Sequence, residues 1–213
     1  MGPVRLGYGT VVAAGAVVRE DITEDRTLVI VGPHDPEKRE FQPHTYRNLA
    51  RVVRNNLLYL ANLVALENWY REVREPFLGR QAMGALVYAG ALAVLGSAKE
   101  ERMKRLTAMA EKVPVSQPAG REFHERAADV CALFAGEPPV PDGEHFLAAF
   151  RLAAADSPDD YIKTIKNLAP DLKRQGVDWL QQIVEVLCEE AGALLKSMEL
   201  FGNDPWIHCW EET

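Results

Sequence analysis

The chain has 213 residues, of which 47% are hydrophobic, so it is long enough to bury a substantial core and too apolar to be disordered throughout. Its net charge of -7 at pH 7 provides no overall basic surface for neutralising phosphates, which argues against nucleic acid as a partner. Three widely spaced cysteines and the absence of a secretory leader pattern predict a cytoplasmic protein with neither a disulfide framework nor a zinc site.

The first 33 residues are rich in valine, threonine and glycine, and their apolar residues recur every six positions. Leu6, Val12 and Val18 each open a six-residue unit. This period is typical of a parallel β-helix, in which one aliphatic side chain per short strand points toward the axis. We therefore expect a short left-handed β-helix coil over residues 1–33, with a valine-rich β-hairpin as the alternative.

The segment LGYGTVVAAGAVVREDITEDRTLVIVGPHDP, which begins at Leu6, resembles the closing coils of hexapeptide-repeat β-helix proteins. Many of these proteins are acyltransferases, so the resemblance implies an alternative function as an acyltransferase-like protein that binds acyl-CoA at the coil. In that case Arg19 would contact a CoA phosphate. The chain departs from the acyltransferase pattern in reading VGPHDP after the coil. Its nearest histidines, His34 and His44, lie in the following linker, so the coil itself offers no catalytic base.

The pattern changes after residues 34–44, a proline-containing stretch of mixed charge that we expect to be a linker. Apolar residues then recur every three or four positions, which predicts a multi-helix domain over residues 45–213. Its first helix is expected to run for roughly 28 residues from a cap at Thr45. A helix of this length exceeds what one small core covers. We therefore expect an oligomer contact in a homo-oligomer, formed by Leu57, Leu60 and Val64.

Three arginines near the start of this helix form a candidate anion-binding site. Arg47, Arg51 and Arg54 are spaced by four and three residues, which places them along one helical face. Such a stripe can hold a phosphate or carboxylate group. The alternative is a solvated face whose charges pair with the acidic residues at positions 20–25.

Several further helices are indicated along the rest of the chain. The uncharged stretch 81–98 has an apolar centre of about fourteen residues, too short to cross a bilayer, and we interpret it as a buried helix. A capping box at Ser97 and Glu100 predicts that a separate helix begins near Ala98. Later helices are expected over 121–134, 144–154, from a cap at Ser157 to Pro170, and over 177–200. We interpret the tryptophans of the tail, Trp206 and Trp210, as apolar docking residues.

The chain resembles the C-terminal part of bacterial UDP-sugar pyrophosphorylase-like proteins in three successive features. These are a closing coil, a proline-containing link and the helical segment YRNLARVVRNNLLYLANLVALENWYREVREPF. In that family a nucleotidyltransferase domain comes first. The resemblance implies that this chain is a non-catalytic assembly and oligomerisation module, whose partners are its own copies and the upstream domain of the same polypeptide. We expect no catalytic or metal-binding residues here, since no Gly-rich phosphate loop opens a helix after a buried strand. Magnesium is expected only in the missing nucleotidyltransferase domain.

Overall fold

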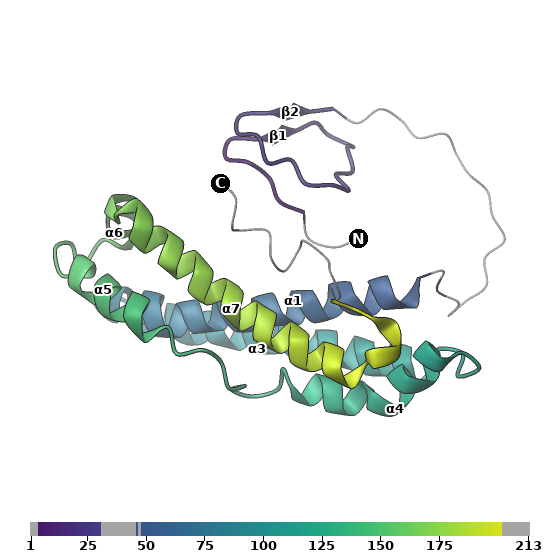
Figure 1. Ribbon diagram of the computed structural model, residues 1–213. Coiled ribbons are helices and arrows are strands. Elements are labelled where there is room, and N and C mark those ends of the chain that lie inside the picture. Colours follow the sequence, from purple (N-terminus) through teal and green to yellow (C-terminus); the bar gives the residue numbers. More distant parts are fainter. Residues whose placement is uncertain (1–3, 31–45, 47, 202–213) are drawn as a thin grey trace.

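A helical bundle and a small N-terminal segment with two short strands make up the computed structural model (Figure 1). The structure describes residues 4–30, 46 and 48–201. The strands are β1 (Val11–Val12) and β2 (Leu28–Val29). The helices are α1 (Leu49–Trp69), α2 (Glu75–Leu78), α3 (Gly84–Ala110), α4 (Pro118–Ala132), α5 (Glu144–Ala154), α6 (Tyr161–Asn167) and α7 (Pro170–Leu194). A π-helical turn (Tyr70–Arg74) joins α1 to α2, and a 3-10 turn (Lys196–Met198) follows α7.

The N-terminal segment does not form the expected left-handed β-helix coil in its described residues 4–30, so that part of the fold prediction is wrong. Val11 pairs with Leu28 in a parallel two-stranded sheet, and an isolated bridge joins Leu6 to Ile22. The residues expected to point toward an axis are not covered, because Leu6 is 47% exposed and Val12 is 36% exposed. A β-helix buries such residues by stacking coil on coil, and the described residues supply no second coil.

Polar contacts, rather than stacked coils, hold this segment together. The carboxylate of Asp21 accepts a hydrogen bond from the backbone N–H of Arg5 at 2.7 Å, and that of Asp25 accepts one from the N–H of Tyr8 at 2.6 Å. The two passes of the chain come so close that a Cβ at Gly7 would lie 2.3 Å from the carbonyl oxygen of Glu24. Gly7 therefore permits the close approach of the two passes, and Asp21 and Asp25 hold them together through hydrogen bonds.

The helical part of the fold prediction is confirmed, and α1 lies at the centre of the bundle. The helix begins at Leu49 and is capped by Asn48, whose side chain accepts a hydrogen bond from the N–H of Arg51 at 2.9 Å. The expected cap, Thr45, lies outside the described residues. Leu57, Leu60 and Val64 are all 0% exposed, and α3 and α7 pack against α1. The expectation that these three residues contact another chain is therefore wrong. Other helices of the same chain cover the stripe that looked too long for one core.

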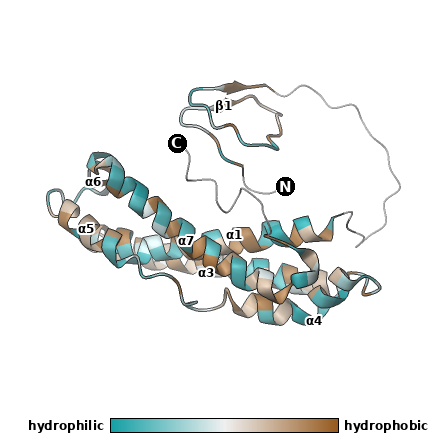
Figure 2. Cartoon of the chain, in the orientation of Figure 1, coloured by the Kyte–Doolittle hydropathy of each residue, from teal (hydrophilic) through white to brown (hydrophobic). Residues whose placement is uncertain are grey.

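Aromatic side chains fill the end of the core near α5. Trp69 of α1 stacks on Phe146 with ring centroids 6.1 Å apart, and Phe146 stacks on Trp179 of α7 at 5.7 Å. Phe77 and Phe150 complete the cluster. Such pairs contribute about 0.5–1.5 kcal/mol each beyond the area that they bury. Along α7, hydrophobic and hydrophilic residues alternate (Figure 2), which is typical of a helix with one buried face.

Helix α3 differs most from expectation. It runs without a break through Ser97, so the capping box does not start a new helix there. Residues 84–96 are rich in alanine and leucine, whose high helix propensity carries the helix across the cap signal. The result is a helix of 27 residues, longer than any other in the described part of the chain.

The remaining helices occur in the expected order. Helix α5 spans Glu144–Ala154 as expected. The starts of the others are shifted: α4 begins at Pro118, α6 at Tyr161 and α7 at Pro170. Asp160 rather than Ser157 caps α6, and proline in the first turn favours the starts of α4 and α7.

Candidate functional site

The first half of α3 presents large apolar side chains to solvent. Leu86, Val87 and Val94 are 67%, 55% and 68% exposed, and Met83, which immediately precedes the helix, is 72% exposed. Single exposed apolar residues are common, whereas a contiguous group on one helix indicates an interaction surface. The prediction of a buried helix at 81–98 is therefore wrong for its outward side. We call this surface the α3 face: Met83, Leu86, Val87, Gly90 and Val94.

The same outward stripe becomes polar in the second half of the helix. Val87 and Val94 are followed at the next heptad position by Glu101, and Ser97 is followed by Lys104. All three polar residues are exposed. Outward charged residues of this kind are typical of a solvated helix surface. The α3 face is therefore apolar where the rest of the same outward stripe is polar, and exposure to solvent alone does not account for its apolar residues.

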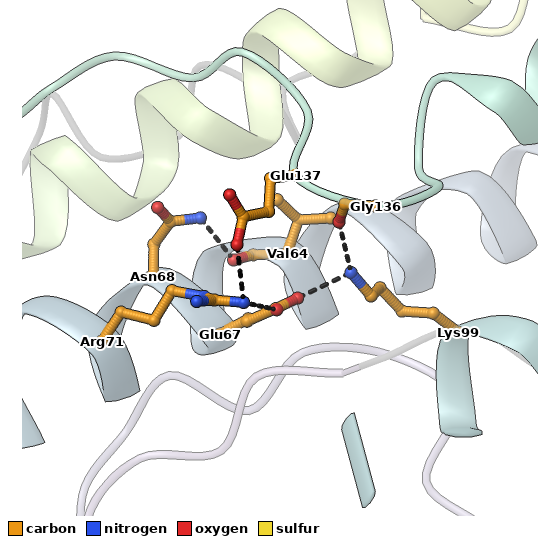
Figure 3. A network of polar contacts seen from close by, with 7 residues as sticks. All are labelled: Val64, Glu67, Asn68, Arg71, Lys99, Gly136 and Glu137. Carbon is orange, nitrogen blue, oxygen red and sulfur yellow. Dashed lines mark hydrogen bonds and ion pairs between the residues drawn. The ribbon is translucent and has the colours of Figure 1, made fainter. Parts of the chain in front are cut away.

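A buried ion pair anchors the opposite side of α3 (Figure 3). The ammonium group of Lys99 donates to Glu67 Oε2 of α1 at 2.6 Å and to the carbonyl oxygen of Gly136 at 3.3 Å. Arg71 donates to the second oxygen of Glu67 at 2.8 Å and lies 3.1 Å from the carboxylate of Glu137. Lys99 and Glu67 are both buried. Rotating α3 to hide its outward face would break this pair at a cost of several kcal/mol.

The electrostatics of Glu67 indicate a structural role. Burial raises the pKa of this carboxyl, but hydrogen bonds from Lys99 and Arg71 outweigh burial, so its pKa lies below the ordinary value. A general acid or base at neutral pH needs a pKa shifted toward 7. Glu67 is instead held as a carboxylate, which suits a clamp between α1 and α3.

A second polar link reinforces the clamp. Arg102 of α3 donates to the side-chain oxygen of Asn56 in α1 at 2.8 Å, and its guanidinium carbon lies 4.4 Å from the ring centroid of Tyr59. Asn56 also donates to the carbonyl oxygen of Val52 at 2.7 Å. The second half of α3 is thus tied to α1 by two polar contacts, Lys99 with Glu67 and Arg102 with Asn56.

The turn before α3 fixes where the α3 face begins. Met83 adopts a left-handed backbone conformation with φ of 62°, which is uncommon for a residue other than glycine. A Cβ at the next residue, Gly84, would lie 1.7 Å from the carbonyl oxygen of Leu78. Only glycine permits this approach of α3 to the end of α2. The turn leaves the Met83 side chain on the surface beside the outward stripe.

An apolar groove of about 670 Å³ also lies between α1 and α7. Its walls include Leu58 and Leu66 of α1 and Val177 and Val184 of α7, and Val4 of the N-terminal segment lines it as well. The groove is mostly apolar. We treat the α3 face as the candidate site.

The structure describes Arg19, Arg51 and Arg54 of the residues singled out in the sequence as ligand contacts, and it leaves the predicted anion site of Arg47, Arg51 and Arg54 untested. Arg19 is exposed in the N-terminal segment, and without a β-helix coil the acyl-CoA site loses the geometry on which it rested. Arg47 lies outside the described residues. Arg51 is exposed, whereas Arg54 is partly buried and lies close enough to Cys188 to oppose the rise in its pKa.

The described part of the chain offers neither a reactive buried thiol nor a cluster of metal ligands. Burial raises the pKa of the Cys188 thiol to about 12, so this cysteine is inert at neutral pH. No group of three histidine, cysteine or acidic residues among residues 4–30 and 48–201 is placed to hold a metal ion. The described helices do not combine the length and apolarity needed to span a bilayer. The tail residues Trp206 and Trp210 lie outside the described residues.

Neither a family model, nor a curated protein, nor a solved structure matches this chain. The α3 face is therefore interpreted from its own physical chemistry. Sequence reasoning missed this face, although a signal for it was present. A helix that is apolar on all sides needs two covered faces, and the core of one chain supplies only one of them.

Proposed function

We propose that this chain is a non-catalytic assembly module that binds a protein partner through the α3 face. One observation carries the proposal: the outward stripe of α3 is apolar from Met83 to Val94 and charged from Glu101 onward. Burying one exposed Val, Leu or Met side chain contributes about 1.5–3 kcal/mol. Several such residues on one face are therefore sufficient to offset part of the entropic cost of association.

The rigidity of α3 supports this role. The clamp formed by Glu67 and Lys99 holds the helix in a fixed rotation, so the α3 face is preorganised for binding. A surface that does not need to be ordered on association loses less free energy when the partner docks. The Gly84 turn adds to this by fixing the start of the helix.

The proposed setting follows from the resemblance to UDP-sugar pyrophosphorylase-like proteins. In this setting the bundle serves the assembly of a sugar-nucleotide-forming enzyme in the cytoplasm, and the chemistry resides in a nucleotidyltransferase domain of that enzyme. Cys131 and Cys188, which are both free thiols, are compatible with a reducing compartment. The helical segment that carries the resemblance corresponds to α1 and α2.

The proposal is tested by native electrophoresis of the tagged chain in extracts of its natural host. We expect the wild-type chain to migrate in a complex larger than one chain, and the double variant Leu86→Glu/Val94→Glu to migrate as a monomer. Lys104→Glu, on the charged half of the same helix, is the matched control and should keep the complex. Circular dichroism should show unchanged helicity in both variants. If the wild-type chain and the double variant migrate alike, the α3 face is not a binding surface.

A further inference from the structure

We propose that the partner of the α3 face is a second copy of this chain, with the two α3 helices packed antiparallel around a two-fold axis. This inference rests on the proposed function, because it names the partner of the same surface. It adds the identity of the partner, the direction of the contacting helix and the register of the contact.

The spacing of the α3 face indicates that another helix covers it. Met83, Val87, Gly90 and Val94 follow one another at steps of four, three and four residues. This is the spacing with which a helix forms a seam against a second helix in a coiled coil. The seam stops at Ser97, where the outward residues become polar, so the contact is short. Its twelve residues span about 18 Å at 1.5 Å per residue.

The seam is complementary to itself when the second copy runs antiparallel. With the two-fold axis between Tyr88 and Ala89, Met83 of each copy lies opposite Val94 of the other. Val87 of each copy then lies opposite Gly90 of the other. Every position of the seam thus finds a partner within the same four residues, as a two-fold interface requires.

Gly90 has no evident role within one chain. A Cβ added there would meet no atom of the described structure within 4 Å, so packing in the monomer does not require a glycine. Glycine in the middle of a helix is unfavourable relative to alanine. In the antiparallel register, the missing side chain leaves room for Val87 of the second copy. The large exposed residues provide the driving force, and Gly90 sets the register.

Charges around the seam fit the same arrangement. The stretch 81–98 has no charge that would repel an identical surface. A lipid surface is a poorer match, because interfacial helices flank their apolar face with lysine and arginine, and residues 81–98 contain neither.

Dimer formation through α3 is tested by sedimentation velocity of the purified full chain over a range of concentrations. A seam this short suggests a weak interface, so we expect a monomer–dimer equilibrium with a dissociation constant on the order of micromolar, resolved between about 1 and 200 µM. Val87→Glu should weaken the dimer at least 100-fold. Lys104→Glu, the matched control on the solvated half of the helix, should change the dissociation constant less than about threefold.

Gly90→Leu tests the register separately from folding. We expect this variant to fold at least as stably as the wild type in urea unfolding, because the new side chain meets open space and favours the helix. We also expect at least a tenfold weaker dimer, because the leucine would occupy the position of the second copy's Val87. If Gly90→Leu dimerises as tightly as the wild type, the register is wrong.

Failure of this inference can be told apart from failure of the proposed function. If the purified wild-type chain stays monomeric at the highest concentration while the host complex still depends on Leu86 and Val94, the partner is a different protein. The inference then falls and the proposed function stands. A monomer in both experiments contradicts both.

Discussion

The two halves of α3 share one helix, one inward stripe and one core, and they differ in what they present to solvent. Outward residues are Leu86, Val87 and Val94 in the first half, whereas Glu101 and Lys104 take the corresponding place in the second. Both halves pack against the same core, so core packing does not explain why only the first half exposes apolar side chains. The second half presents the charged residues of an ordinary solvated surface, and it provides an internal reference for the exposed apolar side chains of the first half.

Leu86 and Leu106, on opposite sides of α3, are expected to differ most when each is truncated. Leu106 is buried in the core, whereas Leu86 is largely exposed. We expect Leu106→Ala to lower the free energy of unfolding by about 3 kcal/mol, because the truncation leaves a cavity. Leu86→Ala should change it by less than about 0.5 kcal/mol in the monomer. Urea unfolding at low protein concentration measures both. A large loss for Leu86→Ala would mean that the first half of α3 is part of the core.

Breaking the clamp tests whether the second half anchors the helix. We expect Lys99→Met to lower the free energy of unfolding by about 2 kcal/mol near neutral pH, less than for a fully isolated buried pair, because Arg71 still contacts Glu67. The matched control is Arg105→Met, whose ion pair with Glu101 is exposed and screened by solvent, so its effect should be much smaller than that of Lys99→Met. Equal effects of the two substitutions would contradict a special role for the Glu67 clamp.

The clamp also makes stability depend on pH in a defined direction. The pKa of Glu67 in the folded chain lies below its ordinary value of 4.5. Its contribution is therefore complete above pH 4.5 and is lost as the pH falls through the lower folded value. Lys99→Met removes one of the hydrogen bonds that lower this pKa. The loss of Glu67's contribution should still begin near pH 4.5, where the unfolded chain takes up its proton, but it should be smaller and end at a higher pH in the variant, as measured by urea unfolding at a series of pH values.

Two of the three glycines of α3, Gly84 and Gly90, are expected to give effects of opposite sign when each is replaced by alanine. Gly84→Ala places a Cβ against the carbonyl oxygen of Leu78 and should cost about 1–3 kcal/mol. Gly90→Ala meets open space and should stabilise the monomer by about 0.5–1 kcal/mol through helix propensity. Thermal unfolding under monomeric conditions compares them directly. A destabilising Gly90→Ala would mean that something in the chain already covers this position.

Local patterns predicted the helical part of the fold well. The spacing of Val53, Leu57, Leu60 and Val64 gives α1 and its buried stripe directly. The same pattern did not identify what covers that stripe, because coverage depends on how α3 and α7 fold back in space. The residues expected to meet another chain are therefore core residues, and the exposed apolar surface lies on a helix that was interpreted as buried.

In the N-terminal segment, the sequence pattern predicted the wrong structure. A six-residue period at Leu6, Val12 and Val18 is a property of a repeating stack, and the energy of such a stack comes from neighbouring coils. The described residues carry this pattern without the further coils that would stack on it. The aliphatic residues then stay partly exposed, and the local hydrogen bonds of Asp21 and Asp25 decide the conformation.

The most direct test of the α3 face is the accessibility of its methyl groups to a dissolved paramagnetic probe, measured by NMR on the purified chain. Leu152, which is 77% exposed on α5, serves as the internal reference for a free surface residue. We expect the methyl signals of Val87 and Val94 to be protected at high protein concentration and to approach the relaxation of Leu152 on dilution. Equal relaxation of Val87, Val94 and Leu152 at every concentration would contradict a self-associating α3 face.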